Sequence, residues 1–323
     1  MVAVSALARP IAGWRLVRRR RARRTLAFYA FIAPWLLGFV ALTVVPLVLG
    51  FLTSLTNYDG LNLASLRFLG LANYRRILSD ADARFALGRT LLWSAINTPL
   101  WLMCSFALAL ILNQEVRGRG LFRTLYYLPS VIPAVAAVWA WKIILDRNYG
   151  LINGLLSVFR PGTAIPWLSE YALYGVTAIA LWSGLGSGMV IFLAGLQGIP
   201  EELIEAARID GAGTGRVFRH ITIPLMTPVI FFQLVMALIS SFQQFVIPLL
   251  LTTSGAQGAV TPRSVYLYMI HTYRQLFTYQ RFGYGVALLW VLFVVVMALT
   301  VLVFRSASYW VYYEALAEEG RGR

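Results

Sequence analysis

The sequence predicts an all-α protein, a polytopic bundle of six helices that cross a membrane. Two observations carry this prediction. The 323 residues are 59% hydrophobic and only 13% charged, whereas soluble globular proteins carry roughly 25% charged residues. The apolar residues also gather in six runs that reach the roughly 17–25 residues a helix needs to cross a bilayer. A soluble core could not bury this much apolar side chain, so we expect a membrane protein.

The six runs divide the chain into spans and loops. With these limits every Asp, Glu, Lys and Arg lies in a loop, as the cost of a charge in hydrocarbon requires. The third span is short and contains Pro129 and Pro133. Such breaks persist where neighbouring helices or a cavity satisfy the freed backbone groups. The expected spans are residues 26–54, 90–112, 124–141, 171–195, 224–252 and 283–304.

A strongly basic segment, residues 1–25, precedes the first span. A basic cluster in this position indicates the cytoplasmic side and can hold anionic lipid headgroups. The first span is too long for a signal peptide and no small-residue cleavage site follows it, so we expect a retained anchor. Six spans then place both termini in the cytoplasm, with a membrane domain at 26–308 and a tail at 309–323. The basic residues are Arg9, Arg15, Arg18, Arg19, Arg20, Arg21, Arg23 and Arg24.

The loops are expected to alternate between the two sides of the membrane. Basic residues exceed acidic ones more strongly on the inner side, which supports the orientation, but the outer loops are basic as well. The outer segment 55–89 is expected to form a short amphipathic cap and not a separate domain. The inner loops are 113–123 and 196–223, and the outer loops are 55–89, 142–170 and 253–282.

Several functions are excluded by what the composition lacks. The net charge of +15 could suggest nucleic acid, but the basic residues cluster beside the membrane, so we expect no such partner. The single Cys104 lies in an apolar run, so no disulfide framework exists. His220 and His271 lie far apart and no Cys/His spacing fits a metal, so we expect neither a metal site nor catalytic residues. His271, in an outer loop, is expected to be a solvated surface residue.

The inner loop 198–223 has the pattern of a helix and a turn. Pro200 followed by Glu201 and Glu202 starts a helix, with negative charge at the positive end of its dipole. Leu203 follows at helical spacing. The loop is therefore expected to be structured and not a simple connector.

The second half of this helix has residues that allow close contact with a partner protein and a residue that can end the helix. Ala206 and Ala207 are small and allow a partner surface to approach closely. Gly211 can adopt the left-handed conformation that ends a helix. A second short helix is expected at about residues 216–221, and the next span begins at Pro224.

Fixed residue types stand at fixed spacing in this loop: Glu205, Ala206, Ala207, Gly211, Ile221, Ile223 and Pro224. The pattern resembles that of binding-protein-dependent ATP-binding-cassette (ABC) importer permeases, which reads Glu-Ala-Ala, three residues, Gly, nine residues, Ile, one residue, Leu-Pro. Ile223 in place of Leu is the one departure. An ordinary interfacial helix would explain neither the spacing nor the placement before the penultimate span.

The resemblance implies a type I ABC importer permease fold with cytoplasmic coupling helices. In that family the two short helices dock into a groove on the ATPase subunit and transmit its closure to the channel. The residues that the resemblance assigns to coupling with the ATPase are Glu205, Ala206, Ala207, Asp210, Gly211, Ile221 and Pro224.

Other segments are similar to the oligosaccharide branch of the same family. Within that branch the chain resembles the first permease of the maltose-importer type, in a version with six spans. Its overall likeness extends to the permease of alginate (polyuronate) oligosaccharide importers. The segments that carry the similarity are 128–133, Trp139, Trp141, Asp146, 149–153, 182–186 and 193–197.

The resemblance also implies partners in the bacterial inner membrane. They are a second homologous permease, two ATPase subunits, and a periplasmic or lipoprotein solute-binding protein. The chain has no Gly-x4-Gly-Lys-Ser/Thr phosphate loop, and the alternating Gly211, Gly213 and Gly215 follow no predicted strand. We therefore expect no cofactor and no enzymatic activity on this chain, with ATP and Mg²⁺ bound by the ATPase subunits.

A route for sugar needs hydroxyl-pairing side chains and flat apolar faces inside the bundle. In the maltose-type family the substrate contacts come from the spans that flank the coupling loop, and Asn97 in the second span is a further candidate. Ser and Gln in membranes also hold helices together, at about 0.6 kcal/mol per contact, and Trp139 and Trp141 are expected in the outer aromatic belt. The pathway candidates are Trp182, Ser183, Ser187, Ser241, Gln244 and Asn97.

Two other classes of protein fit the sequence less well. A membrane enzyme would need converging acid and base groups at membrane depth, and the spans contain none. An ion-coupled secondary sugar transporter usually shows internal repeats and an ionisable residue in the membrane, and neither is found in the spans. Copurification of an ATPase subunit would separate these classes from an ABC importer.

The expected substrate is an acidic (alginate or uronate) oligosaccharide, because a basic outer mouth would concentrate a polyanion. A neutral oligosaccharide and glycerol-phosphate stay as alternatives. The outer arginines could instead dock an acidic face of the binding protein, or pair with the acidic residues of the outer loops, which are Asp59, Asp80, Asp82, Asp146 and Glu170.

Overall fold

The computed structural model describes residues 25, 27–62, 64, 66–114, 117–252 and 261–312. Most of the predicted basic segment 1–25 and of the tail 309–323 lies outside them. The described residues are largely helical. Their one β-type contact is an isolated antiparallel bridge between Thr56 and Phe68, and no strand is formed among them. The all-α fold predicted from the sequence is therefore confirmed.

Among the described residues five helices are long and apolar enough to cross a membrane, and a bent pair of helices counts as a sixth if it crosses as one span. The helix 27–54 runs through a π-helical segment, η1 (Val40–Val44), into α2 (Val45–Ser54). The helix 214–242 runs through α10 (Thr214–Val217) and η2 (Phe218–Thr222) into α11 (Ile223–Phe242). The five long helices are Ala27–Ser54, α4 (Ala81–Asn113), α8 (Ala172–Gln197), Thr214–Phe242 and α14 (Phe282–Trp310).

The third span is not the straight helix predicted at 124–141. It consists of α5 (Arg119–Val131) and α6 (Ala134–Ile144), bent by 99° at the break between them. Ile132 there has an extended backbone, with ψ of 129°. Proline disfavours helical geometry in the residue before it and has no N–H to donate. Pro133 therefore ends the first half of this span.

Two long helices continue through a proline by switching to π-helical hydrogen bonding. In η2 the N–H of Ile223 donates to the carbonyl of Phe218, directly before Pro224. In η1 the same pattern precedes Pro46. Proline has no N–H to donate, and the i to i−5 hydrogen bonds of a π-turn keep the helix continuous at this point. The short helix predicted at 216–221 is thus not separate, because it is the first part of the span.

The fifth predicted span, 224–252, is divided. α11 ends at Phe242, residues 243–245 form a break, and the short α12 (Val246–Thr252) follows. The predicted outer cap 55–89 contains α3 (Ala72–Ser79), while the remainder from Ala81 onward already belongs to α4. Charged residues at the start of α4 therefore stand on the same helix as the second span.

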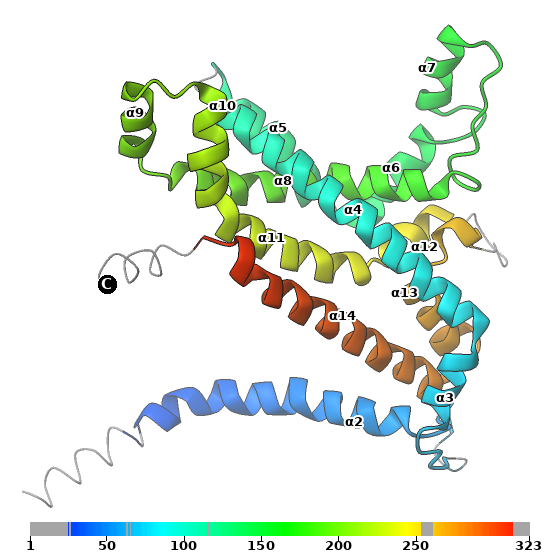
Figure 1. Cartoon of the computed structure of the whole chain (residues 1–323). Helices are drawn as coiled ribbons and strands as arrows, with labels where there is room; N and C mark the ends of the chain where they lie inside the picture. Colours follow the sequence, from blue (N-terminus) through cyan, green and yellow to red (C-terminus); the bar gives the residue numbers. More distant parts are fainter. Residues whose placement is uncertain are drawn as a thin grey trace, which may run out of the picture.

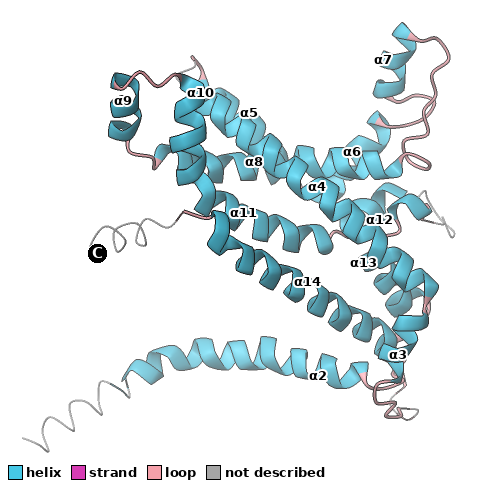
Figure 2. Ribbon diagram, viewed as in Figure 1, coloured by secondary structure: helices cyan, strands magenta, loops and turns pink. Residues whose placement is uncertain are grey.

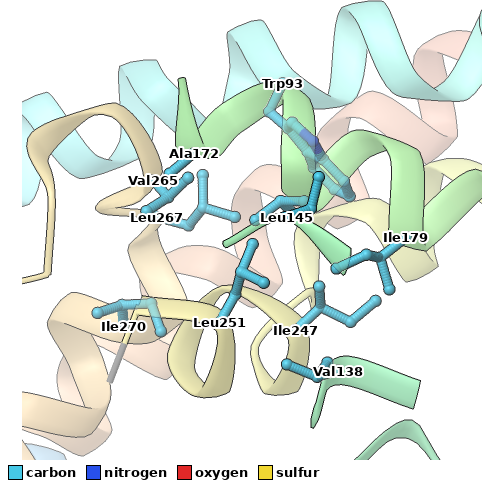
Figure 3. Close-up of a cluster of buried hydrophobic side chains, with 11 residues drawn as sticks. Trp93, Val138, Leu145, Ala172, Ile179, Ile247, Leu251, Val265, Leu267 and Ile270 are labelled. Carbon is cyan, nitrogen blue, oxygen red and sulfur yellow. The ribbon is translucent and has the colours of Figure 1, made fainter. Parts of the chain in front are cut away.

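The long helices pack unequally (Figure 1). α4 packs against α8 and α11, and α14 lies along α11. The helix 27–54 approaches the others through α2, which packs on α14, and its other end stands apart. One buried cluster joins α4, α8 and α12 with the segments after Val265 (Figure 3). The buried core thus includes the contact of α12 with α8.

The outer loop 142–170 projects from the bundle and carries α7 (Leu151–Phe159) between two loops (Figure 2). Its shape is held by Asn153, whose buried amide donates to the carbonyls of Arg147 and Ile165 at 3.0 Å each. The indole of Trp167 donates to the same side chain at 3.0 Å. One asparagine therefore fixes both ends of this projection.

Candidate functional site: a docking loop and a membrane cavity

The inner loop forms the helix that its sequence predicts. α9 (Glu201–Ile209) begins directly after Pro200, with Glu201 and Glu202 in its first turn. Pro200 has an extended ψ of 126° and serves as the N-cap residue. Two carboxylates near the N-terminus stabilise the helix through its dipole.

The end of α9 is a hydrogen-bonded glycine turn. The N–H of Gly211 donates to the carbonyl of Arg208 at 3.0 Å, and that of Ala212 donates to Ala207 at 2.8 Å. This is the double closure of a Schellman motif. Gly211 has φ of +81°, and a Cβ there would meet nothing within 4 Å. The position therefore requires glycine for its backbone conformation and not for space.

The surface of α9 is open to a partner. α9 has no buried residue, and it stands away from the bundle beyond α10 (Figure 1). Leu203 and Ile209 are 46% and 86% exposed. Between α9 and the following helix lies a recess of about 390 Å³. Its lining residues are Ala207, Asp210, Ala212, Arg216, Val217, His220 and Ile221.

The predicted coupling residues fall into three places. Ala207, Asp210 and Ile221 line the recess. Glu205 and Ala206 are exposed on α9. Gly211 lies in the turn after α9, and Pro224 lies at the start of α11. Three of the seven residues thus line one recess, and Glu205 and Ala206 stand on the exposed helix beside it.

A second cavity lies inside the bundle between α4, α8 and α11. Its volume is about 310 Å³. Four predicted pathway residues line it, namely Asn97, Ser187, Ser241 and Gln244. The complete lining is Trp93, Asn97, Trp101, Ala180, Gly184, Ser187, Gln233, Met236, Ala237, Ser240, Ser241 and Gln244.

Two predicted pathway residues do not reach this cavity. Ala180, Gly184 and Ser187 occupy one face of α8 by helical spacing, whereas Trp182 lies on the opposite face and Ser183 at the edge of the first. The ring of Trp182 meets Trp141 of α6 edge to face at 5.8 Å. The hydroxyl of Ser183 donates to the carbonyl of Ile179 in its own helix at 2.8 Å. Neither side chain belongs to the cavity lining.

Two tryptophans of α4 line the cavity and were missed from the sequence. Trp93 is 2% exposed, and its indole N–H donates to the hydroxyl of Thr177 at 3.2 Å. Trp101 lies against the glycines of α8, because a Cβ at Gly184 would stand 2.7 Å from its Nε1 and one at Gly188 2.6 Å from its Cζ2. The signal was present, since Trp93, Asn97 and Trp101 recur every four residues along one helix face.

The cavity is polar but uncharged. The Oδ1 atom of Asn97 is buried and has no hydrogen-bond partner among the described residues. The hydroxyls of Ser94 and Ser241 hydrogen-bond across α4 and α11. The amide of Gln233 donates to the carbonyl of Gly188 at 3.3 Å. Hydroxyl, amide and indole groups together suit a polyhydroxylated solute.

The outer arginines were expected either to pair with the acidic residues of the outer loops or to remain available for a partner. In the described part of the chain Arg263 and Asp82 form the one arginine–carboxylate ion pair, at 3.1 Å. Asp59 and Asp146 instead accept backbone N–H groups in turns. The hydrogen bonds from Asn62 and Leu61 lower the pKa of Asp59 below its ordinary value.

The prediction for His271 is wrong. The side chain lies in α13 (Tyr268–Tyr273) and is 1% exposed. It is buried because α13 packs on α4 and α14. Among the described residues no three His, Cys, Asp or Glu side chains are grouped as a metal site requires.

The described part of the chain combines long apolar helices with an exposed helix–turn loop and an uncharged polar cavity. The profile of binding-protein-dependent transport system inner membrane components matches residues 102–312. The chain belongs to this family.

Two relatives of this chain are permeases of transport systems. The probable ABC transporter permease protein YesP of Bacillus subtilis is 36% identical over 91% of this chain and 94% of its own length. The trehalose/maltose transport system permease protein MalF of Thermococcus litoralis is 30% identical, over 88% of this chain and 95% of its own.

A solved structure has the same fold. A chain in the crystal structure of the bacterial alginate ABC transporter, in complex with alginate pentasaccharide-bound periplasmic protein, matches with a TM-score of 0.77 and 21% identity. The match covers 89% of this chain and 96% of that one.

Proposed function

We propose that this chain is one of two permease subunits of an ABC importer and carries an oligosaccharide through the cavity between α4, α8 and α11. An external binding protein delivers the sugar, and two ATPase subunits bind ATP and Mg²⁺ on the cytoplasmic side, where α9 and both termini lie. The relatives with permease names support this assignment.

One observation carries the proposal: a single helix joins the docking loop to the cavity. The helix Thr214–Phe242 starts at the turn after α9 and contributes Gln233, Ser240 and Ser241 to the cavity lining. Its 29 residues correspond to about 43 Å at the helical rise. A displacement of α9 by an ATPase would therefore move one wall of the cavity.

The pathway residues in this proposal are those that face the cavity. Asn97, Ser187, Ser241 and Gln244 would pair with sugar hydroxyls, and the indole of Trp101 would offer an apolar face. The unpartnered Oδ1 of Asn97 is an acceptor ready for a hydroxyl donor. Trp182 and Ser183 would act through packing.

For the substrate class we retain the acidic oligosaccharide, selected at the outer mouth. The outer arginines support it, since Arg263 is the one that pairs with a carboxylate in the described part of the chain. The uncharged cavity supports a second candidate, a neutral oligosaccharide, and a relative is named for trehalose/maltose transport. An acid would have to cross this cavity with its charge shared by water or a cation.

The test is uptake by the complete assembly in liposomes, with its binding protein outside and ATP inside. A uronate oligomer, a maltodextrin and glycerol-phosphate would be compared. Oligosaccharide uptake that depends on ATP and on the binding protein is expected. Full activity of this chain as a homomer without ATPase subunits would overturn the proposal.

A further inference from the structure

A partly buried carboxylate, that of Asp80, joins three helices at the end of the bundle opposite α9. Oδ1 of Asp80 accepts the backbone N–H groups of Asp82 at 2.9 Å and Ala83 at 3.1 Å, and so caps α4. Oδ2 accepts the hydroxyl of Tyr284 from α14 at 2.6 Å. Figure 1 places this junction beside α3 and α13, far along α4 from the docking loop.

The third helix at the junction is α13, which presents His271. Its Nε2 lies 3.7 Å from Oδ2 of Asp80, and its Nδ1 lies 2.9 Å from the hydroxyl of Tyr266. A neutral ring carries one proton. When Nδ1 accepts the Tyr266 hydroxyl, the single ring proton is on Nε2, which is buried, has no hydrogen-bond partner among the described residues and faces the carboxylate at 3.7 Å. The neutral ring therefore fits this site without a charge of its own.

Burial makes a charged His271 costly. Desolvation lowers the pKa of His271 below its ordinary value, against the opposing attraction of Asp80 and Asp82, and Arg274 lowers it further. Burial alone would raise the pKa of Asp80, but the hydrogen bonds from Tyr284, Ala83 and Asp82 hold it below its ordinary value. The site therefore holds a carboxylate beside a neutral imidazole.

The other polar groups around the ring do not remove this cost. The hydroxyl of Tyr268 is buried without a partner among the described residues. Arg274 lies over the ring of Tyr266 at 5.5 Å, and Arg76 over that of Tyr284 at 4.9 Å. Arg263 is paired with Asp82. Of these arginines Arg274 acts on the His271 ring directly, and the charge of the acidic neighbour Asp82 is partly neutralised by Arg263.

We propose that Asp80 and His271 form a proton-sensitive latch at the outer end of the bundle. With His271 neutral, α13 stays packed on α4 and α14. A proton taken up from the outside places a charge in a buried site, and separation of α13 lets that charge hydrate.

The sign follows from linkage. A histidine whose pKa is lowered in the packed arrangement binds more protons when α13 is separated. The packed arrangement is therefore fully favoured above the ordinary histidine pKa. It loses stability as the pH falls from that value to the lowered one.

The latch is connected to the cavity through α4. The N–H of Tyr268, at the start of α13, donates to the hydroxyl of Thr90 at 2.8 Å. Trp93 and Asn97 follow Thr90 by one and two turns on the same helix and line the cavity. Separation of α13 would break this hydrogen bond and free the outer part of one cavity wall.

The test is hydrogen exchange on the complete assembly in nanodiscs, at about pH 7.5 and about pH 5.5, corrected for intrinsic exchange rates. Peptides that cover residues 263–278 should lose protection severalfold at the lower pH. His271→Gln should abolish this pH dependence, whereas His220→Gln, at the exposed histidine of the inner loop, should retain it. This readout needs no transport, so it is independent of the proposed function.

A second variant keeps the test decisive if His271→Gln does not fold. Asp80→Asn preserves a good helix cap but removes the negative charge that favours the protonated ring. The pKa of His271 in the packed arrangement then falls further, so the loss of protection should still begin near the ordinary histidine pKa but be larger at about pH 5.5 than in the wild type. Protection that is the same at both pH values in the wild type, or a pH dependence that survives His271→Gln, would overturn the latch.

Discussion

The two ends of this bundle are built in opposite ways. At the outer end the buried Asn73 and His271 and the partly buried Asp80 connect helices through polar contacts within the chain. At the inner end α9 buries no side chain and leaves Leu203 and Ile209 exposed. The outer end is thus held by its own residues, whereas the inner end offers a surface for another subunit.

The largest effect is expected from Gly211→Val at the inner end. A left-handed backbone costs a residue with a side chain roughly 1–2 kcal/mol, and β-branching adds to it, so the Schellman turn should open and misplace α9. Transport should be uncoupled from ATP hydrolysis, measured as uptake per ATP consumed. Gly213→Ala is the matched control, because Gly213 has an ordinary φ of −70° and open space around it. Equal coupling in the two variants would contradict the role of the turn.

The cavity should respond next, to Gly188→Ala. The added methyl would stand 2.6 Å from Trp101 and 2.7 Å from the hydroxyl of Ser105, so α4 and α8 must separate. Overpacking of this kind costs roughly 1–3 kcal/mol. The melting temperature should fall and sugar uptake should decrease. Gly120→Ala, in α5 with nothing within 4 Å, should change neither.

A paired experiment tests the contrast between the two ends directly. Asn73→Ala removes two hydrogen bonds of 2.8 Å to the carbonyls of Ser54 and Thr56, and each buried acceptor left unpaired costs about 1–3 kcal/mol. It should lower the melting temperature of the purified permease. Ile209→Ser should leave that temperature unchanged and weaken ATPase binding. A reversed result would show that α9 stabilises the fold and is not reserved for a partner.

The inner end was predictable and the cavity only in part, for a physical reason. The helix and turn at Pro200, Glu201 and Gly211 depend on interactions within a few residues, which the sequence displays. The cavity depends on how α4 and α8 are rotated about their axes. That rotation is set by contacts such as Trp101 against Gly184, between residues distant in sequence.

The outer end shows the same limit more sharply. His271 lies in a segment predicted to be an outer loop, yet α13 buries it against a carboxylate almost two hundred residues away. The bend at Pro133 was visible as a break, but its angle of 99° follows from packing against α8 and α12. Six spans were predictable by length and composition, whereas the start of α4 at Ala81 was not.

The smallest effect on stability, and the most informative one for the substrate, is expected from Arg263→Gln. The pair that Arg263 forms with Asp82 is exposed, with 76% and 57% of the two side chains open to solvent. Such pairs contribute roughly 0–1 kcal/mol, so the melting temperature should hardly move.

If outer arginines attract a polyanion, the variant should slow uptake of a uronate oligomer at low salt. That difference should vanish between about 0.05 and about 0.5 M salt, because screening shortens the reach of the charge. Uptake of a maltodextrin is the internal control and should be unaffected. Binding-protein affinity is measured in parallel, because a docking role for Arg263 would lower that affinity and reduce uptake of both sugars alike. A loss confined to the uronate oligomer at unchanged affinity supports the acidic substrate, and an equal loss of both sugars with lower affinity supports a docking role for Arg263 and contradicts its role in attracting the substrate.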